Sequence, residues 1–310
     1  MDTHVFNMFI IRKFYSLIRK VYYQYLSTHN PIKLADHLYK DRTGTQKGIN
    51  WDCPKDLNEK INWLKFYSDI TKWSELADKL AVRKYIEDKG YGQYLVPLLG
   101  VWKNADEIDF SKLPESFVLK TNNGAGTVLL VEDKTLIDQK EIRSQLNQWL
   151  KMRFGLIQAE PHYLRIKPCI IAESILREVS DISSSLIDYK IWCFDGKAFG
   201  TFVCYNRHRF KTDNEWHDLE WNYRPEWSVY SDHCKDGKGK IPKPKNYEKM
   251  ISFAEDLSKG FPQVRVDLYN IDGQIYFGEM TFTSSGGYMN KHSKEVLLEM
   301  GQLTIISKDK

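Results

Sequence analysis

Two acidic residues, Asp267 and Glu279, lie on the arms of a predicted β-hairpin near the end of the chain. The predicted strands run over 264–269 and 274–280, with the turn at 272–273. This turn pairs the two carboxylates across the strands to within about two residues of register. A cation would relieve their repulsion, and Mg²⁺ binds few carboxylates together with phosphate oxygens and water. The alternative is a pair of solvated carboxylates on opposite faces.

A short loop containing Gly124 and Gly126 is the second candidate. It joins two apolar strands within 117–131, and Lys120 ends the first of them. Backbone N–H groups of glycine approach an anion closely because no Cβ obstructs them. The pattern is strand–loop–strand, whereas a P-loop or a Rossmann fingerprint leads into a helix. We predict that this hairpin covers the phosphates of a nucleotide; the alternative is an ordinary Asn-Gly hairpin turn.

Basic residues at strand ends suit the same chemistry. Lys190 follows Asp188 at strand spacing, so both side chains point to one face. Arg207 leaves the next predicted strand together with His208 and Arg209. Guanidinium groups recognise phosphate or carboxylate, and the alternative is a solvated basic cluster.

A small polar loop follows Glu279 and spans 281–287. Beside a metal site, its N–H and hydroxyl groups would supply donors for a developing oxyanion. The alternative is an ordinary surface turn.

Composition narrows the class of protein. The chain has 310 residues and a net charge of +4, which is too small and too dispersed to indicate a nucleic-acid partner. Its five cysteines include no C-x-x-C pair, so neither a zinc site nor a redox motif is expected, and the odd number fits a reducing cytoplasm. No stretch approaches the roughly 18–20 apolar residues of a membrane span.

A basic amphipathic helix is predicted over 5–26. Such a helix binds an anionic membrane surface or a partner enzyme of the same pathway. The alternative is that its apolar stripe packs on the protein itself.

Other helices and strands must position the candidate residues. Periodicity predicts helices beginning near 57 and spanning 73–89, 136–154, 247–259 and 295–300, and strands over 169–173, 186–194 and 198–204. We expect Pro31 to end the first helix and 41–45 to form a loop. The charges of the 73–89 helix are expected to form a solvated face, and 210–245 is expected to be a long excursion with little regular structure.

Taken together, these pieces resemble the TupA-like branch of the ATP-grasp superfamily. The resemblance rests on 58–64, 78–83, 117–120 with 123–126, 188–190 with 193–197, 265–269 and 276–282. Their order and spacing make the match, which covers roughly 51–287. It implies an α+β, ATP-grasp fold in which two antiparallel-sheet subdomains clamp ATP. We expect a helical N-terminal region over 1–95, a small subdomain with the glycine-rich loop over 96–172, and a C-terminal subdomain with the metal site over 173–310.

The resemblance also implies ATP and Mg²⁺ as cofactors and a role for each candidate residue. The implied catalytic residues are Lys120, Lys190 and Arg207. The implied nucleotide-binding residues are Lys79, Lys120, Asn123, Gly124, Ala125, Gly126, Thr127, Glu173 and Lys190, with Glu173 at the adenine hinge. The implied metal ligands are Asp267, Glu279 and Thr281. Many ATP-grasp ligases carry Glu-x-Asn where this chain has Glu279-Met280-Thr281, so the number of Mg²⁺ ions stays open.

The implied activity is that of an ATP-dependent carboxylate–amine ligase that works through an acyl phosphate. The implied partners are a small-molecule or glycan-linked carboxylate and an amine acceptor. The implied setting is bacterial surface polysaccharide synthesis (capsule, O-antigen or teichuronopeptide), with a sugar acid or amino acid as substrate, in the cytoplasm or at the inner membrane face. Two alternatives stay open: a phosphotransferase acting on a sugar hydroxyl, and a non-catalytic nucleotide-binding module.

Overall fold

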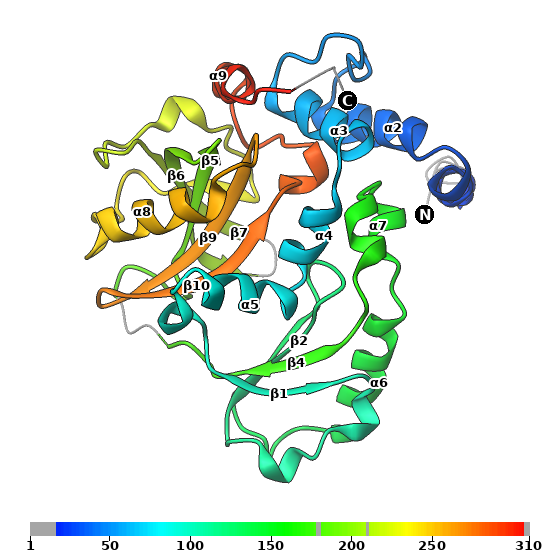
Figure 1. Cartoon of the computed structure of the whole chain (residues 1–310). Coiled ribbons are helices and arrows are strands. Elements are labelled where there is room, and N and C mark those ends of the chain that lie inside the picture. The colour runs from blue at the N-terminus through cyan, green and yellow to red at the C-terminus, as the bar shows by residue number, and fades with distance from the viewer. Residues whose placement is uncertain (1–16, 178–180, 209–210, 307–310) are drawn as a thin grey trace, which may run out of the picture.

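The computed structural model describes residues 17–177, 181–208 and 211–306 and contains two β-sheets (Figure 1). The smaller sheet has the order β1-β4-β2-β3, with every neighbouring pair antiparallel. Its strands are β1 (Leu98–Trp102), β2 (Phe117–Thr121), β3 (Val128–Val131) and β4 (Ile170–Glu173). Alternate residues of β2, including Phe117 and Leu119, are buried and pack in one core with Ile142 and Leu146 of α6 (Gln139–Leu150).

The larger sheet has the order β10-β9-β5-β6-β7-β8 and is antiparallel except for the β7–β8 pair. Its strands are β5 (Asp188–Phe194), β6 (Lys197–His208), β7 (Lys211–His217), β8 (Cys234–Asp236), β9 (Val264–Ile271) and β10 (Gln274–Thr281). The predicted hairpin of β9 and β10 is confirmed, and the predicted strands β5 and β6 form another hairpin. Their turns place Asp195 and Gly196, and Asp272 and Gly273, at positive φ, as a two-residue turn that matches strand twist requires.

Helices cover both faces of the larger sheet. On one face α8 (Tyr247–Ser258) packs with α4 (Thr71–Ala77) and α5 (Ala81–Asp88) in a single apolar cluster. On the other face Trp192 and Trp216 of the sheet pack against α3 (Leu57–Tyr67) and α9 (Lys294–Leu303). The architecture is therefore α+β with two antiparallel-rich sheets, as expected.

The segment α4–α5 lies between the two sheets (Figure 1). The Tyr85 hydroxyl donates to the Leu257 carbonyl of α8 at 3.0 Å, whereas Arg83 forms an ion pair with Glu173 of β4. The prediction of one helix over 73–89 is wrong. The chain leaves the helix at Asp78, whose Oδ1 accepts from the Leu80 N–H at 2.8 Å and so stabilises the turn that leads into α5.

The expectation of little regular structure over 210–245 is also wrong, because this stretch contains β7 and β8. Polar side chains obscure the pattern of β7, yet Glu215 and His217 are buried. Glu215 accepts from Tyr205 Oη at 2.7 Å and lies 2.9 Å from Nε2 of His217. Hydrogen bonds across the sheet satisfy these groups, so they need no water.

The N-terminal part is helical over 17–29 and again in α2 (Pro31–Thr43). Pro31 begins α2, with the Asn30 side chain accepting from the Lys33 N–H at 2.9 Å. The expected loop over 41–45 is therefore wrong for its first three residues. Residues 5–16 of the predicted amphipathic helix lie outside the described residues, and no described helix is long and apolar enough to cross a bilayer.

Short helical turns complete the described structure. They are α7 (Phe154–Ile157), η1 (Gly92–Tyr94), η2 (Ala105–Glu107), η3 (Phe110–Lys112), η4 (Pro161–Arg165), η5 (Pro225–Trp227) and η6 (Ser284–Gly287).

Candidate active site

Asp267 and Glu279 are direct partners across β9 and β10, which confirms the predicted register. A bulge between Phe277 and Glu279 sets this pairing. Arg265 joins the pair: its Nη2 lies 2.7 Å from Asp267 Oδ2, 3.2 Å from Thr281 Oγ1 and 3.5 Å from Glu279 Oε1. The oxygens of all three predicted metal ligands thus converge on one cationic nitrogen.

Sequence reasoning assigned no role to Arg265, although a signal was available. Arg265 precedes Asp267 by two residues in a strand, so the two side chains share a face. Its Nη1 also donates to Ser284 Oγ at 3.1 Å. Arg265 therefore links the carboxylate pair to the polar loop that follows β10.

Lys190 and Arg207 reach the same centre from β5 and β6. Lys190 is the register partner of Asp267. Its Nζ donates to Asp267 and, at 2.7 Å, to Asp188, which shares its face as predicted. Arg207 donates to the same oxygen of Asp188. The structure thus brings Lys190, Arg207 and Asp267 together.

The charges of this cluster stabilise one another. Burial alone would raise the pKa of the Asp267 carboxyl, but Arg265 and Lys190 outweigh it and lower that pKa. Burial alone would lower the pKa of Lys190, but Asp188 and Asp267 raise it. Lys190, Arg265 and Asp267 therefore stay ionised at neutral pH.

On the smaller sheet, Lys120 and Glu173 form an ion pair between β2 and β4. The second oxygen of Glu173 accepts from Arg83 Nη1 at 3.3 Å, and Arg83 Nη2 donates to the Val96 carbonyl at 2.9 Å. Sequence reasoning assigned no role to Arg83. The adenine-hinge role of Glu173 and the phosphate role of Lys120 stay predictions.

The glycine loop is fixed at both ends. The Asn123 side-chain amide donates to the carbonyls of Trp149 at 3.2 Å and Met152 at 3.1 Å. Thr127 Oγ1 lies 2.9 Å from Thr121 Oγ1, within a buried pair. Asn123 and Thr127 therefore anchor the loop to its own subdomain.

The tip of the loop is exposed. A Cβ on Gly124 would lie 3.0 Å from the Phe154 side chain, so a larger residue at this position would crowd that ring. Ala125 and Gly126 are exposed, and Gly126 has φ of 77° with open space around it. The backbone N–H groups of the tip are therefore accessible to an anion.

Lys79 contacts the glycine loop and responds to the charge of Glu279. Its Nζ donates to the Gly124 carbonyl at 2.7 Å. Burial lowers the pKa of Lys79, and the Glu279 carboxylate is the strongest charge that opposes this shift. The expectation of a solvated face is wrong for Lys79, because the break after α4 turns it into the space between the two sheets.

The loop after β10 forms η6 and is held by three polar residues of α3. Lys65 Nζ donates to the Gly286 carbonyl at 2.8 Å, and Asn62 Nδ2 donates to the Gly287 carbonyl at 2.7 Å. Asn58 Nδ2 donates to the carbonyl at position 289 at 2.9 Å. The predicted oxyanion role of this loop stays a prediction.

The donor set near Arg265 fits a hard cation. Asp267, Glu279 and Thr281 offer only oxygen atoms, which Mg²⁺ prefers. Among the described residues, no group of three or more histidine, cysteine or acidic side chains is placed to hold a metal. A metal here would therefore depend on phosphate oxygens and water for its remaining ligands.

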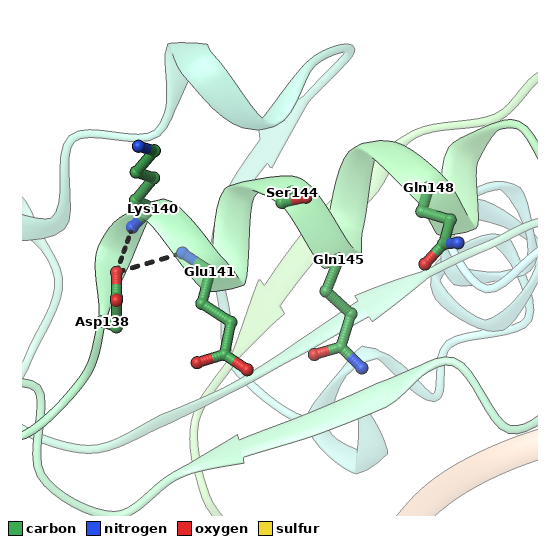
Figure 2. Close-up of a pocket in the computed structure, with 6 residues that line it drawn as sticks. All are labelled: Asp138, Lys140, Glu141, Ser144, Gln145 and Gln148. Carbon is green, nitrogen blue, oxygen red and sulfur yellow. Dashed lines mark hydrogen bonds between the residues drawn. The ribbon is translucent and has the colours of Figure 1, made fainter.

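A shallow hollow on α6 does not belong to this site. Figure 2 shows that its six lining residues come from one helix and its cap. Asp138 is occupied as the cap, since it accepts from the backbone N–H groups of Lys140 at 2.8 Å and Glu141 at 3.1 Å. The hollow contains none of the candidate residues.

This chain matches one family model and is distantly similar to several solved structures. Residues 59–305 match the family model described as TupA-like ATPgrasp, whereas no curated protein matches. A D-alanine–D-alanine ligase from Bacillus anthracis, in complex with ATP, is 15% identical with a TM-score of 0.39; the match covers 69% of this chain and only 56% of that ligase. A second structure of that ligase is 16% identical with a TM-score of 0.46, covering 76% of this chain and 69% of the other. D-cycloserine synthetase DcsG is 14% identical with a TM-score of 0.40, and the match covers 76% of this chain and 70% of the synthetase. Because the family model covers most of its length, this chain belongs to the TupA-like ATP-grasp family.

Proposed function

We propose that this protein is an ATP-dependent ligase that activates a carboxylate as an acyl phosphate and joins it to an amine. The observation that supports this best is the hydrogen bond from Lys79 to the glycine loop, since the carboxylate of Glu279 also acts electrostatically on Lys79. A phosphate-type loop and an acidic side chain that both act on one lysine support a nucleotide site here. Membership of an ATP-grasp family supports ATP as the nucleotide.

Each part of the site has a role in this proposal. Residues Lys79 and Lys120, the loop 123–127 and Glu173 bind ATP, with the exposed loop tip covering the phosphates. Asp267, Glu279 and Thr281 hold Mg²⁺, which when bound would neutralise charge on the triphosphate. Lys190, Arg207 and Arg265 place positive charge where the γ-phosphate and the attacking carboxylate meet.

The chemistry proceeds in two displacements. A carboxylate oxygen of the substrate attacks the γ-phosphorus, the bond to the β-phosphate oxygen breaks, and ADP leaves. The amine then attacks the acyl carbon, inorganic phosphate leaves with the former carboxylate oxygen, and the amine loses a proton. N–H groups of the 284–287 loop stabilise the oxyanion formed in the second step.

The finer assignments belong to the same proposal. We place the enzyme in the synthesis of a bacterial surface polysaccharide, acting in the cytoplasm on a sugar acid or amino acid. The domain boundaries at 95 and 172 stay predictions. A phosphotransferase would use the same nucleotide residues, and a non-catalytic module would keep binding without turnover.

Isotope transfer tests the proposal. The protein is incubated with Mg·ATP, carboxylates labelled with ¹⁸O, and amines, and the products are analysed by mass spectrometry. A ligase moves one ¹⁸O atom from the carboxylate to the released phosphate, and it releases phosphate only when acid and amine are both present. A stable phosphorylated product without phosphate release would instead show a phosphotransferase, and nucleotide binding without any product would show a binding module.

A further inference from the structure

A cavity of about 230 Å³ opens beside Lys190 and Arg265. Its walls come from β5, β6, β7 and β9 and from the chain over 284–292. Lys79, Lys120 and the glycine loop, which we assign to ATP, are not among its described lining residues. The cavity therefore adjoins the reacting centre but is separate from most of the nucleotide residues.

The charged side chains that line this cavity are all positive among the described residues. Four lining side chains are cationic, and none of the described lining residues is acidic; the cations are Lys190, Arg207, Arg265 and Lys291. Three carboxylates pair with the first three of these cations: the buried Asp188 and Asp267, and the more exposed Glu279, whose Oε1 lies 3.5 Å from Arg265 Nη2. Lys291 is exposed and forms no ion pair with another described residue. About one positive charge, that of Lys291, therefore remains unpaired and available to a ligand.

Uncharged N–H groups that can donate hydrogen bonds to an anion also line the cavity. Trp192 Nε1 is buried without a hydrogen-bond partner among the described residues. His292 Nδ1 accepts from Trp216 Nε1 at 3.0 Å, so the proton of a neutral His292 is on Nε2. Burial, with help from Arg265, lowers the pKa of His292 to about 3, which keeps the ring neutral.

The cavity also has an aromatic wall. The His292 ring lies 4.9 Å from the Phe202 ring and 6.0 Å from the Trp192 ring, measured between centroids. Rings beside N–H donors suit the carbon skeleton of a small polar molecule. The volume is below the roughly 300–1,000 Å³ of sites for drug-sized ligands, so the fit is to a molecule the size of a monosaccharide or amino acid.

We propose that this cavity binds the acyl-donor substrate, and that this substrate is a small acid with two anionic groups. One group is the carboxylate that reacts beside Arg265, and the other is a second carboxylate or a phosphate attracted by Lys291. The assignment of the ligand as acyl donor rests on the proposed function. The charge preference of the cavity does not rest on the proposed function.

Three acids with the same six-carbon skeleton test the inference: gluconate with one carboxylate, glucarate with two, and 6-phosphogluconate with an added phosphate. Each is titrated by calorimetry into the protein saturated with Mg²⁺ and AMPPNP. We expect at least one dianion to bind ten times or more as tightly as gluconate, and the two dianions identify whether carboxylate or phosphate is preferred. Equal binding of all three acids, binding of none, or displacement of AMPPNP by the dianion overturns the inference.

A failure of the proposed function gives a different result. If AMPPNP does not bind, the ATP site is refuted, and the acids are then titrated into the protein alone. A preference for a dianion in that titration would still support the cavity assignment, and no preference would overturn it.

Lys291 and Lys294 provide a matched pair of variants, since both are exposed and only Lys291 lines the cavity. We expect Lys291→Ala to weaken the preferred dianion about tenfold, to change gluconate less than twofold, and to leave AMPPNP unchanged. Lys291→Glu should abolish the preference, and Lys294→Ala should match the wild type. An equal loss for all three acids, or no loss for the dianion, would contradict the role of Lys291.

Discussion

Asp267 and Glu279 contact the same guanidinium group but differ in burial. The Asp267 side chain is 4% exposed and is bound by Arg265 and Lys190, whereas the Glu279 side chain is 44% exposed. Removing a buried charge leaves its partners unpaired, which costs far more than losing an exposed contact. Substitution of Asp267 therefore tests folding and function together, and substitution of Glu279 tests function.

The two carboxylates should respond differently to amide substitution. Glu279→Gln is expected to change the free energy of unfolding by about 1 kcal/mol or less and to weaken Mg²⁺-dependent nucleotide binding roughly 10–100-fold. Asp267→Asn is expected to destabilise the fold by about 3–5 kcal/mol, because Arg265 and Lys190 lose their shared counter-ion. Urea unfolding and calorimetry with Mg·AMPPNP measure both effects. Full Mg²⁺-dependent binding by the Glu279 variant would refute the metal assignment.

Helix α3 holds the loop after β10 in place through hydrogen bonds. Three of its residues, Asn58, Asn62 and Lys65, follow the i, i+4, i+7 spacing of one helix face. Each donates to a different carbonyl between 286 and 289. The Gly286 carbonyl points toward α3, so the N–H of the same peptide unit, that of Gly287, points away from the helix. The helix thereby fixes the orientation of the loop that we propose as the oxyanion donor.

Asn62→Ala tests whether α3 holds this loop. The substitution leaves the Gly287 carbonyl without its donor in a buried place, which should cost about 1–3 kcal/mol of unfolding free energy. Hydrogen exchange over 284–289 should become faster, while exchange in α6 stays unchanged. Gln145→Ala, at an exposed position of a helix of similar length, serves as the control. Unchanged exchange in the loop would show that α3 does not hold it.

At the scale of the whole molecule, α4–α5 connects the two sheets. Arg83 pairs with Glu173 of the smaller sheet, Tyr85 bonds to α8 on the larger one, and Lys79 lies at the break between the two helices. A nucleotide between the sheets would contact Lys79 directly. Binding should therefore stabilise both subdomains together.

Melting curves with Mg·ATP test this coupling. At a nucleotide concentration one hundred times Kd, the expected stabilisation is about 2.7 kcal/mol, which raises Tm by several degrees. Lys79→Met should lose most of this rise because the buried cation next to the loop is gone. Lys84→Ala is the control, since the Lys84 side chain is 79% exposed on α5. A full rise in Tm in the Lys79 variant would show that Lys79 is not part of the nucleotide site.

Local sequence determined a large part of this molecule. The last hairpin and the Asp267–Glu279 pairing follow from strand alternation and from a turn with aspartate and glycine, which act over a few residues. The hairpin of Lys120 follows from the same signals. The order of these motifs also indicated the TupA-like ATP-grasp family, which the family match confirms.

Tertiary structure alone decided how the site is assembled. Periodicity predicted one helix over 73–89, but Asp78 breaks it and turns Lys79 inward. Periodicity missed β7 because its buried polar residues have partners elsewhere in the sheet. The convergence of three α3 donors on the loop after β10 joins residues up to 231 positions apart. Long-range packing and hydrogen bonding fix such contacts, and local periodicity does not contain them.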